Sequence, residues 1–207
     1  MLLELLEKDF VLMDGGMGTM LIKRGMTAGQ RSDMMNIEKP DVVCGIQREY
    51  VEAGSEILCS NSFSSCSEAL EGTGATAEEV ITAAINIAKK ASSGKALVAV
   101  DIGPTGKLLE PYGDVTYEEV YARFREQATL GEKAGADLAM VETMSDLTEL
   151  RAAVNAVLEN TKLPVFATMT FRDHGKTFIG CSVEEFAEYI NDTIEVVCKR
   201  FHKMGLV

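Results

Sequence analysis

Short apolar runs alternate along the chain with longer segments whose apolar residues recur at helical spacing. Each run has three to five residues without strict alternation of apolar and polar positions, which is typical of strands covered on both faces. The runs are Phe10–Met13, Ile57–Cys59, Ala96–Val100, Leu138–Val141 and Val165–Met169. This order of strands and helices predicts an α/β fold with a parallel sheet and right-handed crossovers. For the helical segment whose apolar residues run from Leu147 to Leu158, Ser145 is predicted as the N-cap.

An internal repeat narrows the choice of α/β fold. Ala53–Ile57 precedes Asn61 by the same spacing at which Ala134–Leu138 precedes Glu142. In each copy a glycine ends a helix, an acidic residue follows in the turn, and a polar residue ends the next strand. Repeated βα units favour a TIM-type (βα)8 barrel over a nucleotide-binding open sheet, because Gly15–Gly18 lacks the spacing of either phosphate-binding glycine motif.

Composition excludes several classes of protein. The chain has 207 residues and a formal net charge of -12, which repels a nucleic-acid backbone. It lacks an apolar run near the ~18 residues of a membrane span, and its first residues do not resemble a secretory signal. Its 5 cysteines are odd in number and form no C-x-x-C pair, which favours reduced thiols in a cytoplasmic protein.

Polar residues follow the apolar runs at the positions where a barrel carries its active site. In chain order they are Asp14, Asn61, Asp101, Glu142 and Thr170. Buried charge costs several kcal/mol unless it is neutralised, so we expect the first four, the acids and the amide, to converge on one mouth and to face the cationic amino group of a small substrate. The alternative is that Asp14 and Asp101 only cap turns. The histidines and cysteines form no recognisable nucleophile–base arrangement, so no catalytic residue is assigned.

Several ordered motifs carry a family resemblance. Ser60–Phe63 resembles a T-N-T-F motif, Gly103–Gly106 resembles G-P-[ST]-G, and Glu142–Asp146 matches E-T-[MF]-x-D. With the opening Met13–Leu21 and the fifth strand Pro164–Phe171, they make the chain similar to the homocysteine S-methyltransferase family. Within that family it most resembles the N-terminal homocysteine-binding domains of cobalamin-dependent methionine synthases.

The resemblance implies a barrel that transfers a methyl group to the sulfur of homocysteine and forms methionine. It implies zinc as the group that stabilises the homocysteine thiolate. By position, the backbone around Gly16, Met17 and Gly18 and the carboxylate of Glu142 would hold the amino acid, and Asp14 and Asn61 would shape the pocket. The candidate substrate-binding residues, with the strand-end Asp101 added, are Asp14, Gly16, Met17, Gly18, Asn61, Asp101 and Glu142.

The C-terminal part departs from the family pattern. The family's zinc ligands are three cysteines, near its sixth and eighth strands, and those motifs do not occur here, so no metal ligand is assigned. Instead Ser182 and Glu185 predict a capping box, and one apolar face continues from Val183 to Phe201. We therefore expect residues 1–207 to form a partial (βα)8 barrel of about five βα units that ends in a long helix and is incomplete at the C-terminus.

Two functions follow from this departure. The first is a homocysteine-binding methyltransferase module, whose partner chain supplies the missing strands or a cobalamin-binding module that carries the methyl donor. The second is a truncated, non-catalytic half-barrel without the zinc site, inactive alone or in need of a partner chain. A third possibility, an unrelated (βα) enzyme acting on a carboxylic acid, rests only on the strand-end acids.

Overall fold

The computed structural model describes residues 2–203, apart from the side chains of residues 3, 173 and 194–203. Four strands form one sheet in chain order, and each pairs in parallel with the next. They are β1 (Ile57–Cys59), β2 (Leu97–Ile102), β3 (Leu138–Met144) and β4 (Val165–Met169). The predicted α/β class is confirmed.

The first predicted strand, Phe10–Met13, is shorter than expected. Only Met13 forms a bridge, with Ile57 of β1, and two backbone hydrogen bonds join Leu12 and Asp14 to the same strand. Phe10 is 77% exposed and Leu12 is 45% exposed, so in the described part of the chain no neighbour extends the ladder along this segment. The segment therefore follows the edge of β1 without becoming a full strand.

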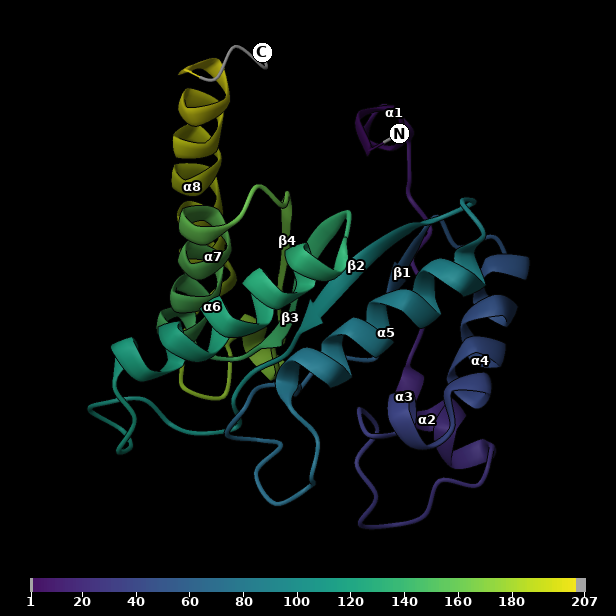
Figure 1. The fold of residues 1–207 in the computed structure, drawn as a ribbon. Coiled ribbons are helices and arrows are strands. Elements are labelled where there is room, and N and C mark those ends of the chain that lie inside the picture. The colour runs from purple at the N-terminus through teal and green to yellow at the C-terminus, as the bar shows by residue number, and fades with distance from the viewer. Residues whose placement is uncertain (1, 204–207) are drawn as a thin grey trace.

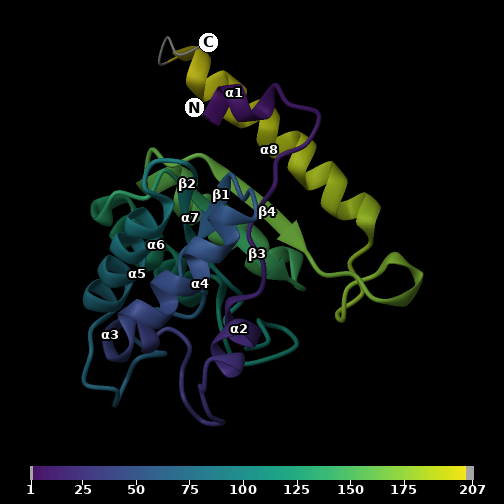
Figure 2. The same cartoon turned by 90° about the vertical axis from the view of Figure 1, so that its right-hand side faces the viewer.

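In chain order the helices are α1 (Leu2–Leu6), α2 (Met17–Lys23), α3 (Met35–Glu38), α4 (Pro40–Glu52), α5 (Ala77–Ser92), α6 (Tyr117–Ala134), α7 (Leu147–Asn160) and α8 (Val183–Lys203), with a 3-10 turn at Asp173–Gly175. Helices α5, α6 and α7 connect the strands and lie on one side of the sheet (Figures 1 and 2). Sequential strand order with crossovers of one hand places the connecting helices on one face. Figures 1 and 2 show α4, α5, α6 and α7 on that face, as in part of a barrel wall, which confirms the predicted partial barrel.

Side chains of β2 alternate between the two faces of the sheet. Val98, Val100 and Ile102 belong to the core beneath α5, α6 and α7. Leu97 and Ala99 belong to a second cluster on the inner face, the face that lines a barrel. Because successive strand residues point to opposite faces, Asp101 shares the inner face with Ala99.

The predicted internal repeat has a structural counterpart. Gly54 and Gly135 both follow the end of a helix with left-handed φ values of 105° and 90°, a conformation that glycine adopts without a steric penalty. Each following acid accepts a hydrogen bond from the backbone of a neighbouring strand segment. Glu56 Oε2 accepts from the Leu12 N–H, and Asp137 Oδ2 accepts from the Val98 N–H.

One predicted cap is confirmed and another is wrong. The Ser182 N–H donates to the Glu185 carboxylate, and the Glu185 N–H donates to Ser182 Oγ at 3.2 Å, as the capping box requires. For α7, Ser145 fits the spacing of an N-cap, but Asp146 takes this role and its Oδ1 accepts from two N–H groups of the first turn. Because β3 extends to Met144, the helix begins one residue later than Ser145 allows.

The last helix runs from Val183 to Lys203 without interruption. Tyr189 in its first half contacts α7, where the Arg151 guanidinium lies 5.2 Å from the centre of the Tyr189 ring. The predicted apolar positions Ile194, Val197 and Phe201 lie outside the described side chains, as does Cys198. The described cysteines, Cys44, Cys59, Cys66 and Cys181, are free thiols. In the part of the chain that the structure describes, no helix combines the length and hydrophobicity of a membrane span.

Candidate functional site

A cavity of about 470 Å³ lies where the first strands of the sheet end. Every residue proposed from the sequence as substrate-binding lines it, namely Asp14, Gly16, Met17, Gly18, Asn61, Asp101 and Glu142. The structure adds Met13, Gly15, Ser32, Cys59, Ser60 and Phe63. The strand-end positions are thus brought together, while the role of each residue stays a prediction.

The position of Asp14 follows from its contact with β1. The Cys59 N–H donates to Asp14 Oδ2 at 2.9 Å, so this carboxyl group is anchored at the end of the strand. The next residues are held by Tyr50, whose hydroxyl donates to the Gly16 carbonyl and whose ring would lie 3.1 Å from a Cβ at Gly15. A larger side chain at Gly15 would push the turn away from Tyr50.

Carboxyl groups converge on the cavity, and the pKa values of Asp14 and Asp101 are raised there. Asp101 is 7% exposed, and its Oδ1 has no hydrogen-bond partner among the described residues. Burial raises the pKa of Asp101 well above its ordinary value, and the charges of Glu142 and Asp14 raise it further. Burial, with a smaller contribution from Glu142, also raises the pKa of Asp14 from 3.8 to about 6. The unliganded cavity therefore retains protons at a pH where free carboxyl groups have lost them.

Cys59 is the thiol of this cavity, and its surroundings keep it protonated. Burial raises the pKa of Cys59 well above its ordinary value, and the nearby carboxylates of Asp101, Asp14 and Glu142 raise it further. A neutral thiol is a poor nucleophile and a poor metal ligand. Cys59 was not among the predicted site residues, although its position at the end of an inner strand indicates that it lines the cavity.

Phe63 forms an apolar wall of the cavity and rests on a glycine. The Gly103 N–H donates to the Phe63 carbonyl at 2.9 Å, and a Cβ at Gly103 would overlap the Phe63 ring. The Gly103 loop is held in turn by buried Glu149, which accepts from the Thr105 N–H at 2.7 Å. The contact between Gly103 and Phe63 joins the Ser60–Phe63 motif to the Gly103–Gly106 motif in space. Both motifs were recognised in the sequence, but the lining role of Phe63 was not.

Thr170 lies apart from the other strand-end residues. The strand β4 ends at Met169, and the Thr170 N–H donates to the Met144 carbonyl at 2.7 Å. Its side chain lines a second cavity of about 330 Å³, together with Thr143, Ser145, Arg172 and Phe178. Thr170, which follows the fifth run, thus lines a different cavity from Asp14, Asn61, Asp101 and Glu142.

The described residues do not provide a zinc site. Among them, no three His, Cys, Asp or Glu side chains are arranged to hold a metal ion. The carboxyl groups and Cys59 line one cavity, but the donor set is mainly hard oxygen, whereas zinc prefers thiolate and imidazole ligands. The zinc implied by the family resemblance thus does not fit the residues described here.

The fold is that of the (βα) barrels, and a polar cavity lies at the strand ends. The family model for homocysteine S-methyltransferase matches residues 11–203, and the chain belongs to this family. The family predicted from the motifs is confirmed, whereas the narrower resemblance to methionine synthases stays a prediction.

Solved structures of the homocysteine methyltransferase MmuM from Escherichia coli share the fold. The metallated form has a TM-score of 0.77 and 22% sequence identity, covering 87% of this chain and 70% of that one. The oxidized form has a TM-score of 0.79 at 22% identity, covering 89% of this chain and 70% of that one. At this identity the likeness supports the fold, and the function is argued from the family and the cavity.

Proposed function

We propose that the cavity binds homocysteine and that the chain acts in transferring a methyl group to the homocysteine sulfur, which forms methionine. Family membership supports the substrate and the reaction class. The observation that carries the proposal is the convergence of Asp14, Asp101 and Glu142 on one cavity. The raised pKa values of Asp14 and Asp101 indicate that carboxylate charge is unfavourable in this cavity, and an ammonium group would neutralise that charge.

Each part of homocysteine has a suitable counterpart in this cavity. Its ammonium group would be bound by Glu142 and Asp101, and its carboxylate by the backbone around Gly16–Gly18. The apolar side chains of Met17 and Phe63 suit the methylene groups and the soft sulfur. We propose that residues 1–207 act as one homocysteine-binding domain.

In the proposed reaction the homocysteine sulfur gives up its proton to water and attacks the methyl carbon of a donor, whose leaving group departs with the electron pair of the methyl–donor bond. The new S–C bond forms as the bond between the methyl carbon and the donor breaks. The carboxylates of the cavity disfavour a thiolate, as they do at Cys59, so they bind and orient the amino acid but do not activate its sulfur. Zinc would supply positive charge at the sulfur when bound, but the described residues do not form its ligand set, and no step is assigned to it.

The methyl donor is proposed on the sequence resemblance alone. That resemblance favours a methionine synthase type of reaction, with methylcobalamin carried on a separate domain or chain. A partner chain that completes the barrel belongs to the same proposal. The alternative donor class is a sulfonium compound such as S-methylmethionine.

A second candidate function is homocysteine binding without methyl transfer. Two observations favour it: the described residues lack a metal-binding group, and the one thiol in the cavity is held neutral. Binding and turnover are therefore measured separately.

The test combines calorimetry with a methionine assay. Homocysteine is titrated into the wild-type chain, Glu142→Gln and a control, Glu118→Gln, which changes an exposed glutamate in the first turn of α6. We expect Glu142→Gln to weaken binding by about tenfold or more, because it removes a charged partner of the ammonium group, and the control to have no effect.

Methionine formation is then assayed with methylcobalamin and with S-methylmethionine. Turnover with either donor supports methyl transfer and contradicts the second candidate, whereas binding without turnover is expected both of the second candidate and of a chain that needs its partner for catalysis. Unchanged affinity in Glu142→Gln would remove this residue from the site. Failure of the folded wild-type chain to bind homocysteine would contradict both candidates.

A further inference from the structure

Two buried asparagines hold each other at the edge of the cavity. Asn36 of α3 is 2% exposed, and Asn61, which follows β1, is 5% exposed. Asn36 Nδ2 donates to the Asn61 carbonyl at 2.7 Å, and Asn61 Nδ2 donates to Asn36 Oδ1 at 3.1 Å. Asn61 Nδ2 also donates to the carbonyl of Ser32. Asn61 and Ser32 line the cavity, and Asn36 lies behind them.

Backbone carbonyls determine which way both side-chain amides face. The carbonyls of Asn61 and Ser32 can only accept hydrogen bonds, so the groups that meet them must be NH₂ groups. Once Asn36 Nδ2 faces the Asn61 carbonyl, its Oδ1 faces Asn61 and accepts from it. Both amide hydrogens of Asn61 are then used, and its Oδ1 is left without a donor among the described residues.

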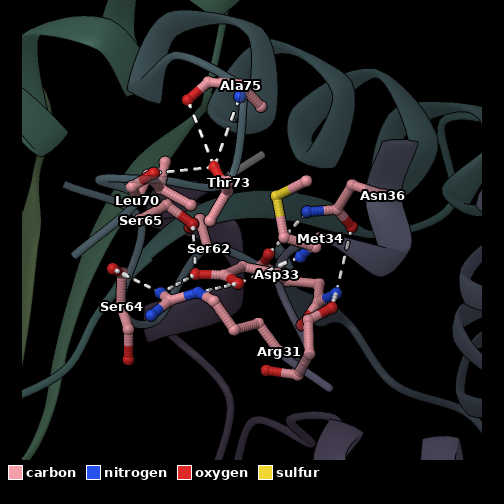
Figure 3. Close-up of polar contacts among 12 residues, drawn as sticks. Arg31, Asp33, Met34, Asn36, Ser62, Ser64, Ser65, Leu70, Thr73 and Ala75 are labelled. Atoms are coloured by element: carbon pink, nitrogen blue, oxygen red, sulfur yellow. Dashed lines mark hydrogen bonds and ion pairs between the residues drawn. The ribbon is translucent and has the colours of Figure 1, made fainter. Parts of the chain in front are cut away.

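The Ser32 carbonyl, which accepts a hydrogen bond from Asn61, lies in a segment that is held by contacts of its neighbours Arg31 and Asp33. The Arg31 guanidinium forms a bidentate ion pair with Asp33, with nitrogen–oxygen distances of 3.0 and 2.6 Å. Arg31 also donates to the Ser64 carbonyl, and Ser65 Oγ donates to Asp33. Figure 3 shows these contacts joining the segment around Asp33 to the loop that follows β1. The Ser32 carbonyl is thereby fixed where Asn61 needs an acceptor.

We propose that Asn36 is a positioning residue for the homocysteine cavity. It orients the Asn61 side chain so that the side-chain Oδ1, and not the NH₂ group, faces the ammonium group of the ligand. The inference rests on the proposed function, because it concerns the same cavity. Together with Asp14, Asp101 and Glu142, the side-chain Oδ1 of Asn61 gives this wall oxygen atoms that can accept hydrogen bonds from an ammonium group. A ligand without an amino group gains nothing from this orientation.

The test compares two ligands that differ only in the amino group. L-homocysteine and 4-sulfanylbutanoate, which lacks the α-amino group, are titrated into the wild-type chain and into Asn36→Ala and Asn36→Asp. The aspartate variant preserves the side-chain shape but replaces the donor to the Asn61 carbonyl with an oxygen. Asn155→Ala is the matched control, because Asn155 is a half-buried asparagine bonded to the Tyr117 hydroxyl on α6.

We expect homocysteine affinity to fall about tenfold in both Asn36 variants, and affinity for the analogue to change less than about twofold. A merely structural role for Asn36 would weaken both ligands by the same factor, and that result would overturn the inference. Circular dichroism shows which variants are folded, and the isosteric Asn36→Asp serves if Asn36→Ala is not.

A ligand-free measurement separates this inference from the proposed function. The side-chain NH₂ signals of Asn61 are identified by nuclear magnetic resonance from their loss in Asn61→Asp. In the wild-type chain they should exchange slowly with solvent, and in Asn36→Asp about tenfold faster. If the wild type binds no homocysteine, the proposed function fails while this exchange still decides whether Asn36 orients Asn61. Equal exchange in the wild type and the variant contradicts the orienting role.

Discussion

The two faces of β2 differ in what they contribute to the molecule. Val98, Val100 and Ile102 point to the helices and are almost fully buried in an apolar core. Leu97 and Ala99 point to the inner face. Asp101, two residues further along the strand, points to the same face, and its pKa is raised. Adjacent residues of one strand thus serve stability and binding separately. Substitutions on the outer face should change folding alone, whereas substitutions at the inner end should change binding and stability in opposite directions.

The largest effect is expected on the outer face. Phe124→Ala removes a ring that is 1% exposed in the core beneath the helices, so the free energy of unfolding should fall by about 3–5 kcal/mol. Urea unfolding measures this loss. Homocysteine affinity of the folded molecules should be unchanged, and Phe178→Ala, at a ring that is 62% exposed, is the control. A loss of affinity without a loss of stability would break the separation of the two faces.

At the inner end of β2, a substitution should raise the free energy of unfolding instead of lowering it. Asp101→Asn replaces a buried carboxyl group, whose protonation the folded state favours, with a neutral group of the same shape. At pH 8 the free energy of unfolding should therefore rise by on the order of 2 kcal/mol, while homocysteine affinity falls. Thermal unfolding and calorimetry of the same samples measure both changes. A variant that is less stable and binds normally would mean that Asp101 is a turn-capping residue.

A pH titration of stability tests the raised pKa of Asp14 in the cavity. Because the pKa of Asp14 is about 6 in the folded chain, above its ordinary 3.8, the folded state binds more protons than the unfolded state between these values. Stability of the ligand-free chain should therefore fall as pH rises through this window, by roughly 1–2 kcal/mol for Asp14. Asp14→Asn should flatten this slope, as measured by urea unfolding at pH 4 to 7. Stability that rises with pH over this range, and does so equally in the variant, would contradict the raised pKa.

The smallest effect belongs to the helices that cover the outer face. Thr116 begins α6 with a capping box in which its side chain accepts from the Glu119 N–H. Thr116→Ala should lower the free energy of unfolding by about 1 kcal/mol without changing homocysteine affinity. Thr116→Ser, which retains the hydroxyl, should keep most of the stability. If the serine variant loses as much as alanine does, the cap is not the cause.

Prediction from the sequence worked where one strand or one helix decides the outcome. The apolar run Val165–Met169 is β4 with the same bounds, since its one polar residue, Thr168, is followed by the apolar Met169. The strand β3 is longer than its run, since Glu142 and Thr143 are polar yet continue it into the cavity region. An apolar criterion therefore ends strands too early at the place where function requires polar residues.

The candidate site was predictable to a similar degree. Asp14, Asp101 and Glu142 were found because parallel strands end at one edge, so their chain positions imply proximity. Ser32 and Asn36 were not found, because they come from a loop and a short helix held by the Arg31–Asp33 pair. Such contacts depend on tertiary packing and leave no periodic signal in the sequence.

Proton release on binding tests most directly whether the acidic cavity binds the ammonium group of homocysteine. Homocysteine is titrated at pH 6 into the wild-type chain in two buffers of different ionisation enthalpy. An ammonium group near Asp14 lowers the pKa of this carboxyl from about 6, so binding should release protons and the heats should differ between buffers. Asp14→Asn should reduce the release. Homocysteine binding with equal heats in both buffers would contradict the account.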